Sequence, residues 1–280
     1  MNEMKFGFVL PEGDARTAAD FAQQAENSGW DGFFVWEPVW GIDAWISLTA
    51  AAMVTQQIRL GTMLSPLSRM RPWKIASEAA TLDNLSRGRV ILSVGLGAID
   101  TGFKDFGEIT DRKTRAELVD ETLAILTGLW SGNPFQHSGK HYQVNITEDT
   151  FRPPPPPVQK PRIPIWVVAA WPSKKSMLRA MSYDGLLPNI IKETGELSME
   201  PIHPAQLAEL THFVSTNRDS DSPFDIIIEG QTPGEDPDRA GQLVAAYQDA
   251  GATWWIEALW SEPDLAKVFS RIKQGPPRGK

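Results

Sequence analysis

The sequence predicts a barrel of eight parallel strands, each followed by a helix. The chain of 280 residues contains eight short, continuously apolar runs. Such runs are typical of parallel strands that are covered on both faces. Helical patterns with start and stop signals lie between the runs, and this repetition is the sequence pattern of a (β/α)8 TIM barrel.

The eight apolar runs are expected to form the barrel strands. They are Lys5–Leu10, Gly32–Trp36, Ile58–Leu64, Arg89–Gly97, Ile163–Ala170, Asp184–Ile191, Phe224–Gly230 and Thr253–Trp260. Trp254 and Trp255 are adjacent in the last run, so they should face opposite sides of the strand. One of them should point into the barrel and the other towards the helices.

The first helices have recognisable ends. Asp14 precedes an apolar stripe that stops at Gly29, as expected for an N-cap and a glycine terminator. Pro72 suits the first turn of a helix that closes at Gly88. Both segments are therefore predicted to be helices.

The later helices have similar signals. The sequence predicts helices over Asp111–Trp130 and from Asp236 to Gly251. Ser261 with Asp264 resembles a capping box for the last helix.

One interval between runs is much longer than the others. It is expected to hold an insertion between strands four and five, at about residues 131–162, with a possible short strand at His141–Val144. The proline run Pro153–Pro157 suits a stiff spacer better than a docking ligand. We expect this insertion and Lys192–Pro204 to follow carboxyl ends of strands and to act as lids, within a single domain spanning residues 1–280.

The main alternative fold is a doubly wound α/β sheet. That fold would normally place a glycine-rich turn directly after the first strand. Here the first strand leads into Leu10, Pro11, Glu12 and Gly13, which have no such pattern. The barrel is therefore preferred.

Composition narrows the class of function. The formal net charge of −8 disfavours nucleic acid and anionic membranes as partners, but it allows a small-molecule substrate. Cysteine is absent, which excludes disulfides and thiol chemistry and fits a cytoplasmic protein. Neither a signal peptide nor an apolar run long enough to cross a bilayer is visible.

Metal and hydrolase chemistry have no clear carrier. The four histidines, His137, His141, His203 and His212, have no carboxylate beside them at ligand spacing, so no metal is expected. The GxSxG and SxxK nucleophile motifs are missing as well. A hydrolase is therefore disfavoured.

The remaining candidates lie at strand ends. Gly95 and Gly97 would let the backbone approach a ligand, although close packing at the barrel rim explains them equally well. Ser173 opens a helix directly after Ala170 and Trp171, where free amides suit a phosphate; an ordinary N-cap is the alternative.

Eleven tryptophans are present, and some of them fall at strand ends. Trp36, Trp171 and Trp260 would form an aromatic wall for a planar ligand there. Most tryptophans are simply large core residues. Both interpretations stay open for each of the three.

One stretch of about 40 residues resembles the luciferase-like oxidoreductases. It runs from Gly61–Pro66 through Arg71–Lys74 and Leu82–Arg89 to Val94–Gly97, similar to that family's GT, RxP, TLDxLSxGR and GxG elements. The order of elements and the segment Ile163–Ser173 agree as well. The resemblance covers essentially the whole chain and implies a TIM-barrel enzyme.

The resemblance implies a cofactor, FMN or coenzyme F420, at the carboxyl end of the barrel. Its members have a bulge with a cis peptide against the cofactor ring, which here corresponds to Met63–Leu64. The residues that would contact the cofactor are Trp36, Glu37, Met63, Leu64, Ser65, Gly95, Leu96, Gly97, Ala169, Ala170, Trp171 and Ser173. The family is often dimeric, so a homodimer is expected.

The chain departs from the family at residues that would define the mechanism. Pro38 stands where a histidine is common, which leaves Glu37 as the nearest titratable group and the candidate catalytic residue. Leu96 replaces a basic side chain, and Ala169–Ala170 replaces Gly-Arg. Phosphate binding would then depend on backbone amides.

Three functions follow. The first is a monooxygenase that uses reduced FMN on a small organic substrate. The second is a coenzyme F420-dependent hydride-transfer oxidoreductase. The third is a non-catalytic flavin-binding barrel.

Overall fold

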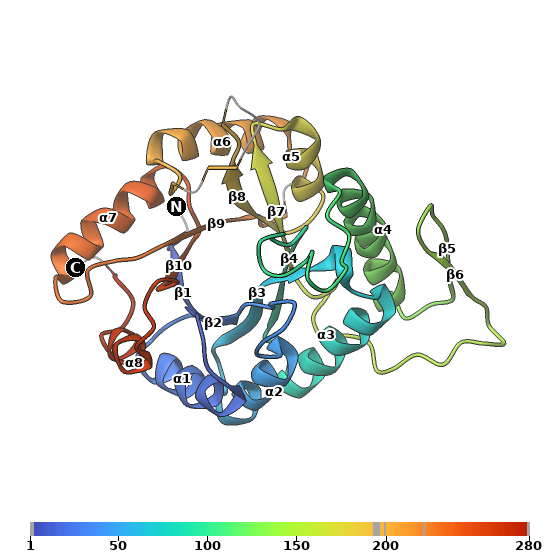
Figure 1. The fold of residues 1–280 in the computed structure, drawn as a ribbon, viewed down its shortest axis with the longest axis horizontal. Helices are drawn as coiled ribbons and strands as arrows, with labels where there is room; N and C mark the ends of the chain where they lie inside the picture. The colour runs from blue at the N-terminus through green and yellow to red at the C-terminus, as the bar shows by residue number, and fades with distance from the viewer. Residues whose placement is uncertain (1–2, 193–196, 199, 221, 279–280) are drawn as a thin grey trace.

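The computed structural model describes residues 3–192, 197–198, 200–220 and 222–278. Eight parallel strands close into a barrel in the order β1-β10-β9-β8-β7-β4-β3-β2, and helices surround it (Figure 1). The strands are β1 Lys5–Leu10, β2 Gly32–Val35, β3 Arg59–Pro66, β4 Val90–Gly95, β7 Ile165–Trp171, β8 Gly185–Ile190, β9 Asp225–Gly230 and β10 Trp254–Ala258. The predicted (β/α)8 barrel and its eight strands are confirmed.

A helix follows each barrel strand. The helices are α1 Ala15–Asn27, α2 Ala44–Val54, α3 Pro72–Ser86, α4 Arg112–Trp130, α5 Lys174–Met181, α6 Pro204–Asn217, α7 Pro237–Asp249 and α8 Leu265–Lys273, with a 3-10 turn, η1, at Leu67–Arg69. Asp14 caps α1 by accepting from the Thr17 amide at 2.8 Å. The prediction of a capping box that begins at Ser261 is wrong. Asp264 is itself the N-cap of α8 and accepts from the Ala266 amide at 2.9 Å.

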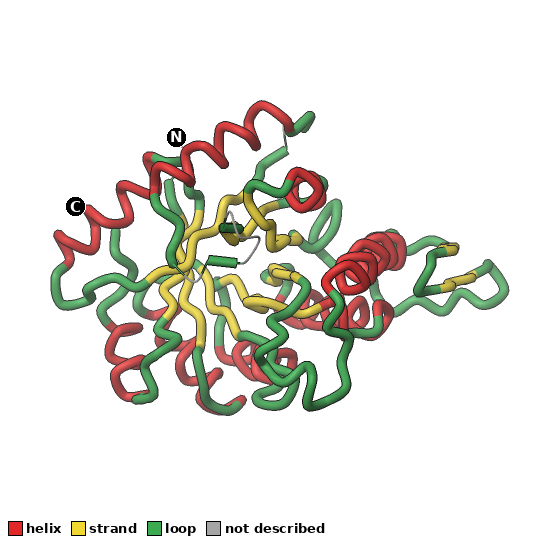
Figure 2. The backbone as a smooth tube through the Cα atoms, turned by 45° about the horizontal axis from the view of Figure 1, so that its top comes forward, coloured by secondary structure: helices red, strands yellow, loops and turns green. Residues whose placement is uncertain are grey.

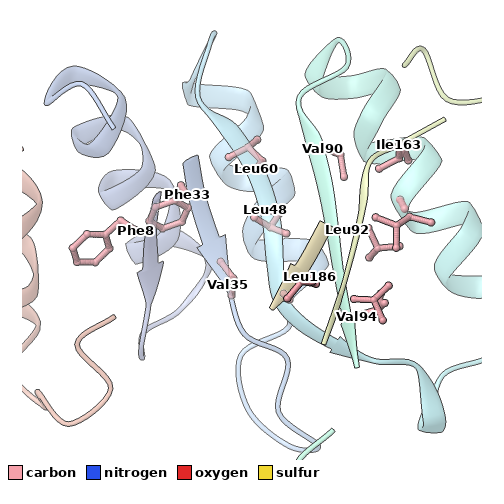
Figure 3. Packing of buried hydrophobic residues seen from close by; sticks show 14 of the residues in the cluster. Phe8, Phe33, Val35, Leu48, Leu60, Val90, Leu92, Val94, Ile163 and Leu186 are labelled. Carbon is pink, nitrogen blue, oxygen red and sulfur yellow. The ribbon is translucent and has the colours of Figure 1, made fainter. Parts of the chain in front are cut away.

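The apolar core has two layers. Figure 3 shows part of the outer layer, where Phe33, Leu48 and Leu60 pack between the strands and helices. The inner layer fills the barrel with the other side chains of the same strands. Trp254 belongs to this inner layer, and Trp255 packs against Tyr247 of α7, as predicted.

The insertion forms an arm outside the barrel. Strands β5 Phe135–Ser138 and β6 Gln143–Ile146 pair as an antiparallel hairpin that projects beyond α4 (Figures 1 and 2). The Glu121 carboxylate of α4 accepts the amides of Lys140, His141 and Tyr142 at 2.8–3.2 Å. These bonds hold the arm against the helix.

The arm does not cover the carboxyl ends of the strands, so the prediction that it forms a lid is wrong. It follows helix α4, which runs back along the barrel wall after β4, rather than following the end of a strand. The prolines 153–157 then return the chain past α3, where the Asn84 amide donates to the Pro156 carbonyl at 2.9 Å. The spacer interpretation of the proline run fits this path.

The second predicted lid, Lys192–Pro204, includes residues 193–196 and 199, which lie outside the described residues. Its described part contains a bridge between Ile191 and Leu197 at the end of β8. No helix in the described ranges has the length and apolar character needed to span a membrane.

Candidate active site

The carboxyl ends of the barrel strands form the mouth of the barrel. Side chains alternate along a strand, so the residue two positions beyond an inner-layer residue faces the barrel axis. The inner layer includes Phe34, Val168, Leu187 and Ile227. The next inward-facing residues, at the mouth, are therefore Trp36, Ala170, Asn189 and Glu229.

The end of β3 has the irregularity that the resemblance implied. The pairing of β3 with β4 shifts register between Thr62 and Ser65, and the Met63–Leu64 peptide is cis. Met63 lies in the inner layer, and the Leu64 side chain is half-buried beside Gly95. The bulge and its cis peptide are thus present; their contact with a cofactor stays a prediction.

Glu37 follows β2 and lies next to this bulge. Ser65 Oγ donates to Glu37 Oε2 at 2.7 Å. Burial raises the pKa of Glu37 to about 7, although the Ser65 hydrogen bond and the charge of Arg69 both act to lower it. A carboxyl with a pKa near neutrality can both donate and accept a proton, which suits general acid–base chemistry.

Arg69 fixes the loop that carries Glu37. One terminal guanidinium nitrogen donates to the Glu37 carbonyl at 3.2 Å and to the Pro38 carbonyl at 2.7 Å. Its Nε is buried and has no hydrogen-bond partner among the described residues. Arg69 therefore positions the backbone around Glu37 and adds a positive charge near its carboxyl group.

The two glycines at the end of β4 are explained by packing. A Cβ on Gly95 would meet the Leu64 side chain at 3.1 Å. Gly97 has a φ of +80°, and a Cβ there would meet Phe103 at 2.6 Å. Of the two interpretations left open, close packing at the rim accounts for both positions.

An arginine side chain that the sequence did not indicate stabilises the turn at Leu96 and Gly97. Arg115 of α4 donates to the carbonyls of Leu96 and Gly97 at 3.2 and 2.8 Å, and Ser68 Oγ donates to Leu96 at 2.8 Å. Arg115 is buried, and its guanidinium lies 5.7 Å from the Phe103 ring centroid. A cation from α4 therefore stabilises the backbone turn that carries Leu96 and Gly97.

The end of β7 offers fewer free amides than expected. The Ala170 amide donates to Ser176 Oγ at 2.9 Å, and the Ser173 amide donates to the Ala170 carbonyl at 2.8 Å. Ala169 faces the outer core. Ser173 is the N-cap of α5 but makes no side-chain cap hydrogen bond, so the first-turn amides of α5 are the ones left for an anion.

The three strand-end tryptophans do not form one wall. Trp36 and Trp260 lie edge to face, with ring centroids 6.3 Å apart, and Trp36 Nε1 donates to the Pro11 carbonyl at 2.7 Å. The Trp171 side chain instead packs against Phe213 of α6, at 5.3 Å. The Trp171 side chain therefore packs on the outer core, and its carbonyl accepts from the Ile191 amide at 2.8 Å.

The histidines have structural partners. His137 and His141 approach the carboxylates of Glu121 and Glu117 at 3.4 and 3.0 Å, which are contacts between residues far apart in the sequence. His203 forms a capping box at the start of α6. Within the described residues, no group of three or more histidine, aspartate or glutamate side chains could hold a metal ion.

Sequence reasoning missed one carboxyl group at the mouth. Glu229 ends β9 in an inward-facing position, and Trp260 Nε1 donates to Glu229 Oε2 at 3.0 Å. The sequence did contain a signal for it. Three isoleucines precede Glu229 in this strand, and the charged residue lies two positions after the inward-facing Ile227. Its neighbour Asn189, on β8, was missed for the same reason.

A parallel barrel with a titratable carboxyl and a bulged strand at its mouth defines a βα-barrel enzyme whose site lies at the strand carboxyl ends. A profile of the luciferase-like monooxygenases matches residues 4–203. The chain belongs to this family.

Two relatives come from Mycobacterium tuberculosis. The chain is 32% identical over 207 residues to an uncharacterized protein of Mycobacterium tuberculosis, which covers 65% of this chain and 71% of the relative. It is also 32% identical over 199 residues to another protein of that organism, named provisionally as a coenzyme F420-dependent oxidoreductase, covering 66% of this chain and 55% of the relative.

Solved structures share the fold. One is the coenzyme F420-dependent tetrahydromethanopterin reductase of Methanopyrus kandleri, with a TM-score of 0.78, 18% identity and coverage of 98% of this chain and 99% of that chain. Another is the oxygenating constituent of 3,6-diketocamphane monooxygenase of Pseudomonas putida in complex with FMN, with a TM-score of 0.74, 16% identity and coverage of 98% and 96%.

Proposed function

We propose that the chain is an oxidoreductase that binds reduced FMN at the barrel mouth and oxygenates a small organic substrate. The observation that carries this proposal is Glu37, a carboxyl with a pKa of about 7 held by Ser65 beside the bulge at Met63–Leu64. A proton-handling group next to an apolar rim is what a redox site needs from its protein.

The surrounding residues fit a planar ring with an anionic tail. Leu64 and the Trp36–Trp260 pair offer apolar surface, and the first-turn amides of α5 offer donors for a phosphate. Lys174 and Lys175, in that first turn, add positive charge. We propose that these groups hold the cofactor, with Gly95, Leu96 and Gly97 shaping the rim beside it.

Reduced FMN, when bound, supplies electrons and the chemistry with oxygen. The protein orients the substrate, excludes water and moves protons. Glu37 Oε2 is held by Ser65 Oγ, and burial raises the pKa of this carboxyl to about 7. It can therefore give a proton to the substrate or take one from it without a large energetic cost.

Cofactor binding tests the proposal directly. Purified protein is expected to bind FMN at micromolar concentration, measured by quenching of flavin fluorescence. Leu64→Asp should weaken binding by about 10-fold or more, because it buries a charge against the ring. Val158→Asp, a change at an exposed residue, should leave binding unchanged. A protein that binds neither FMN nor coenzyme F420 would contradict the proposal.

Coenzyme F420 is the second candidate cofactor. The relative named provisionally as F420-dependent favours it, because that relative aligns with 66% of this chain. In that case the enzyme would transfer hydride rather than activate oxygen, and Glu37 would handle the accompanying proton. Titration with both cofactors on one protein sample decides between them. The non-catalytic alternative is disfavoured by the tuned carboxyl of Glu37.

We also propose a homodimer. Apolar side chains stay exposed on one side of the barrel, with Ile46 and Met53 on α2 and Trp73 on α3 exposed by 64%, 65% and 48%. Exposed apolar side chains such as these, on two neighbouring helices, suit an interface between subunits. Sedimentation is expected to give a dimer, and Ile46→Glu with Met53→Glu should shift it towards monomer. A wild-type monomer at 50 μM would contradict this.

The remaining expectations are proposals of the same kind. We propose that residues 1–280 act as one functional domain in the cytoplasm, with a small molecule as partner and no role for nucleic acid. The net charge of −8 argues against nucleic acid as a partner. The absence of cysteine fits a cytoplasmic location.

A further inference from the structure

Glu229 is an inward-facing carboxyl at the mouth that the proposed chemistry does not use. Ile227 precedes it on the inner face of β9, and Ile226 and Ile228 face the outer core. The Glu229 side chain therefore points towards the barrel axis, yet it is accessible to solvent. Trp260 Nε1 donates to Oε2 at 3.0 Å, and among the described residues no other hydrogen bond to this carboxyl group is present, so Oε1 is the oxygen that a ligand would meet.

Glu229 lines a cavity of about 390 Å³. Leu64 of the β3 bulge lines the same cavity, so a molecule bound there would lie next to the proposed cofactor position. The volume is in the range of a small-molecule site. Most of the lining residues are apolar, and they come chiefly from β8, from β9 and from the segment that follows β8.

Asn189 stands beside Glu229 in this cavity. Strands β8 and β9 pair with Leu186 opposite Ile226, and three residues further along each strand are Asn189 and Glu229. Both side chains line the cavity and face the barrel axis. A carboxyl and an amide on adjacent strands form a polar spot within an otherwise apolar surface.

The charged side chains among the described lining residues are all negative. Its polar lining comes from Asn189, Ser198, Glu200 and Glu229, and the described lining residues include no lysine, arginine or histidine. A carboxylate or phosphate ligand would therefore face negative charge without a counter-charge. Desolvation at the barrel mouth raises the pKa of Glu229 and so disfavours its carboxylate form, which a cation placed beside it would stabilise.

We propose that Glu229 and Asn189 form a substrate subsite that selects an apolar molecule carrying a positively charged nitrogen. Glu229 Oε1 would accept from, or pair with, this nitrogen, and the apolar walls would hold the rest of the molecule. The inference rests on the proposed function, because the same cavity reaches Leu64. It identifies the class of substrate: amines and cationic nitrogen heterocycles rather than carboxylic acids or phosphates.

Three ligands of nearly equal shape test the subsite: cyclohexylmethylamine, cyclohexylmethanol and cyclohexanecarboxylate. Calorimetric titration at pH 7 should show the amine binding at least about 10-fold more tightly than the alcohol, with the carboxylate weakest. Glu229→Gln should remove the preference for the amine and leave the affinity for the alcohol within about 3-fold. Glu148→Gln, an exposed carboxylate on the arm, should change neither.

The pH dependence of the affinity gives a second readout. The amine should stabilise the carboxylate form of Glu229, so its affinity for the wild-type protein should rise as the pH rises through the titration of this group. The Gln variant should lack this dependence. Equal affinities for the amine and the alcohol, or an amine preference that survives in Glu229→Gln, would overturn the inference.

The ligand series is measured with and without FMN. Loss of cofactor binding would count against the proposed function alone, because the preference for the amine is decided by the cavity in either sample. A normal cofactor titration without a preference for the amine would count against the subsite alone. The melting temperature of Glu229→Gln, expected to equal that of the wild type, shows that folding is intact.

Discussion

Replacing Glu37 by glutamine is expected to lower kcat by about 10²- to 10⁴-fold while FMN binding changes by less than about 3-fold. The amide keeps the shape of the side chain, but it cannot gain or lose a proton near neutral pH. Ser65 Oγ can still donate to the amide oxygen, so the local structure should persist. The measurement is the substrate-dependent rate of oxidation of the reduced cofactor.

The pH dependence identifies the group. With the pKa of Glu37 at about 7, the wild-type rate should change across a limb centred near pH 7, and the Gln variant should lack it. A carboxyl whose pKa is raised on folding contributes stability that is present below its ordinary pKa of 4.5 and lost as the pH rises through about 7. The Gln variant should therefore be at least as stable as the wild type at pH 8.

Ser65→Ala is the matched control. The Ser65 hydrogen bond lowers the pKa of Glu37, so its loss should move the midpoint of the pH profile upward. The maximal rate should fall much less than in the Gln variant, because the carboxyl is still present. If the Glu37→Gln variant reacts within about 3-fold of the wild-type rate, Glu37 takes no part in the chemistry.

The barrel could be predicted because its signals are local. Continuous apolar runs and caps such as Asp14 and Pro72 are read within a few residues, and all eight strands appear where these signals place them. The position of the arm could not be predicted this way. It depends on where α4 ends relative to the mouth and on the bonds from Glu121 to three amides of the hairpin, which join distant parts of the chain.

The site was only partly predictable, for a similar reason. The bulge at Met63–Leu64 came from the resemblance, and Glu37 came from its place at a strand end. Arg115 reaches the Leu96 carbonyl from a helix, and no periodicity indicates such a contact. The amide of Ala170 is bonded to Ser176, a pairing that depends on the geometry of the turn.

Alanine at Glu257 is expected to cost about 3–5 kcal/mol in the free energy of unfolding, because it leaves a buried cation without its partner. The Glu257 carboxylate, on β10, is fully buried. It accepts from the Thr232 amide at 2.8 Å, Thr232 Oγ1 at 2.9 Å, Trp255 Nε1 at 3.1 Å and Arg271 Nε at 3.2 Å. Arg271 lies on α8, so this group fastens the last helix to the strand that closes the barrel on β1.

Urea unfolding of Glu257→Ala measures this cost, and Glu262→Ala is the control. Glu262 pairs with the exposed Lys267 at 3.4 Å, and an exposed pair is worth about 0–1 kcal/mol. Arg271→Met in the Glu257→Ala background should recover part of the loss, since it removes the unpaired cation. If Glu257→Ala loses no more stability than Glu262→Ala, then α8 is held by apolar packing of Val268 and Ile272 alone, and the ionic network contributes nothing.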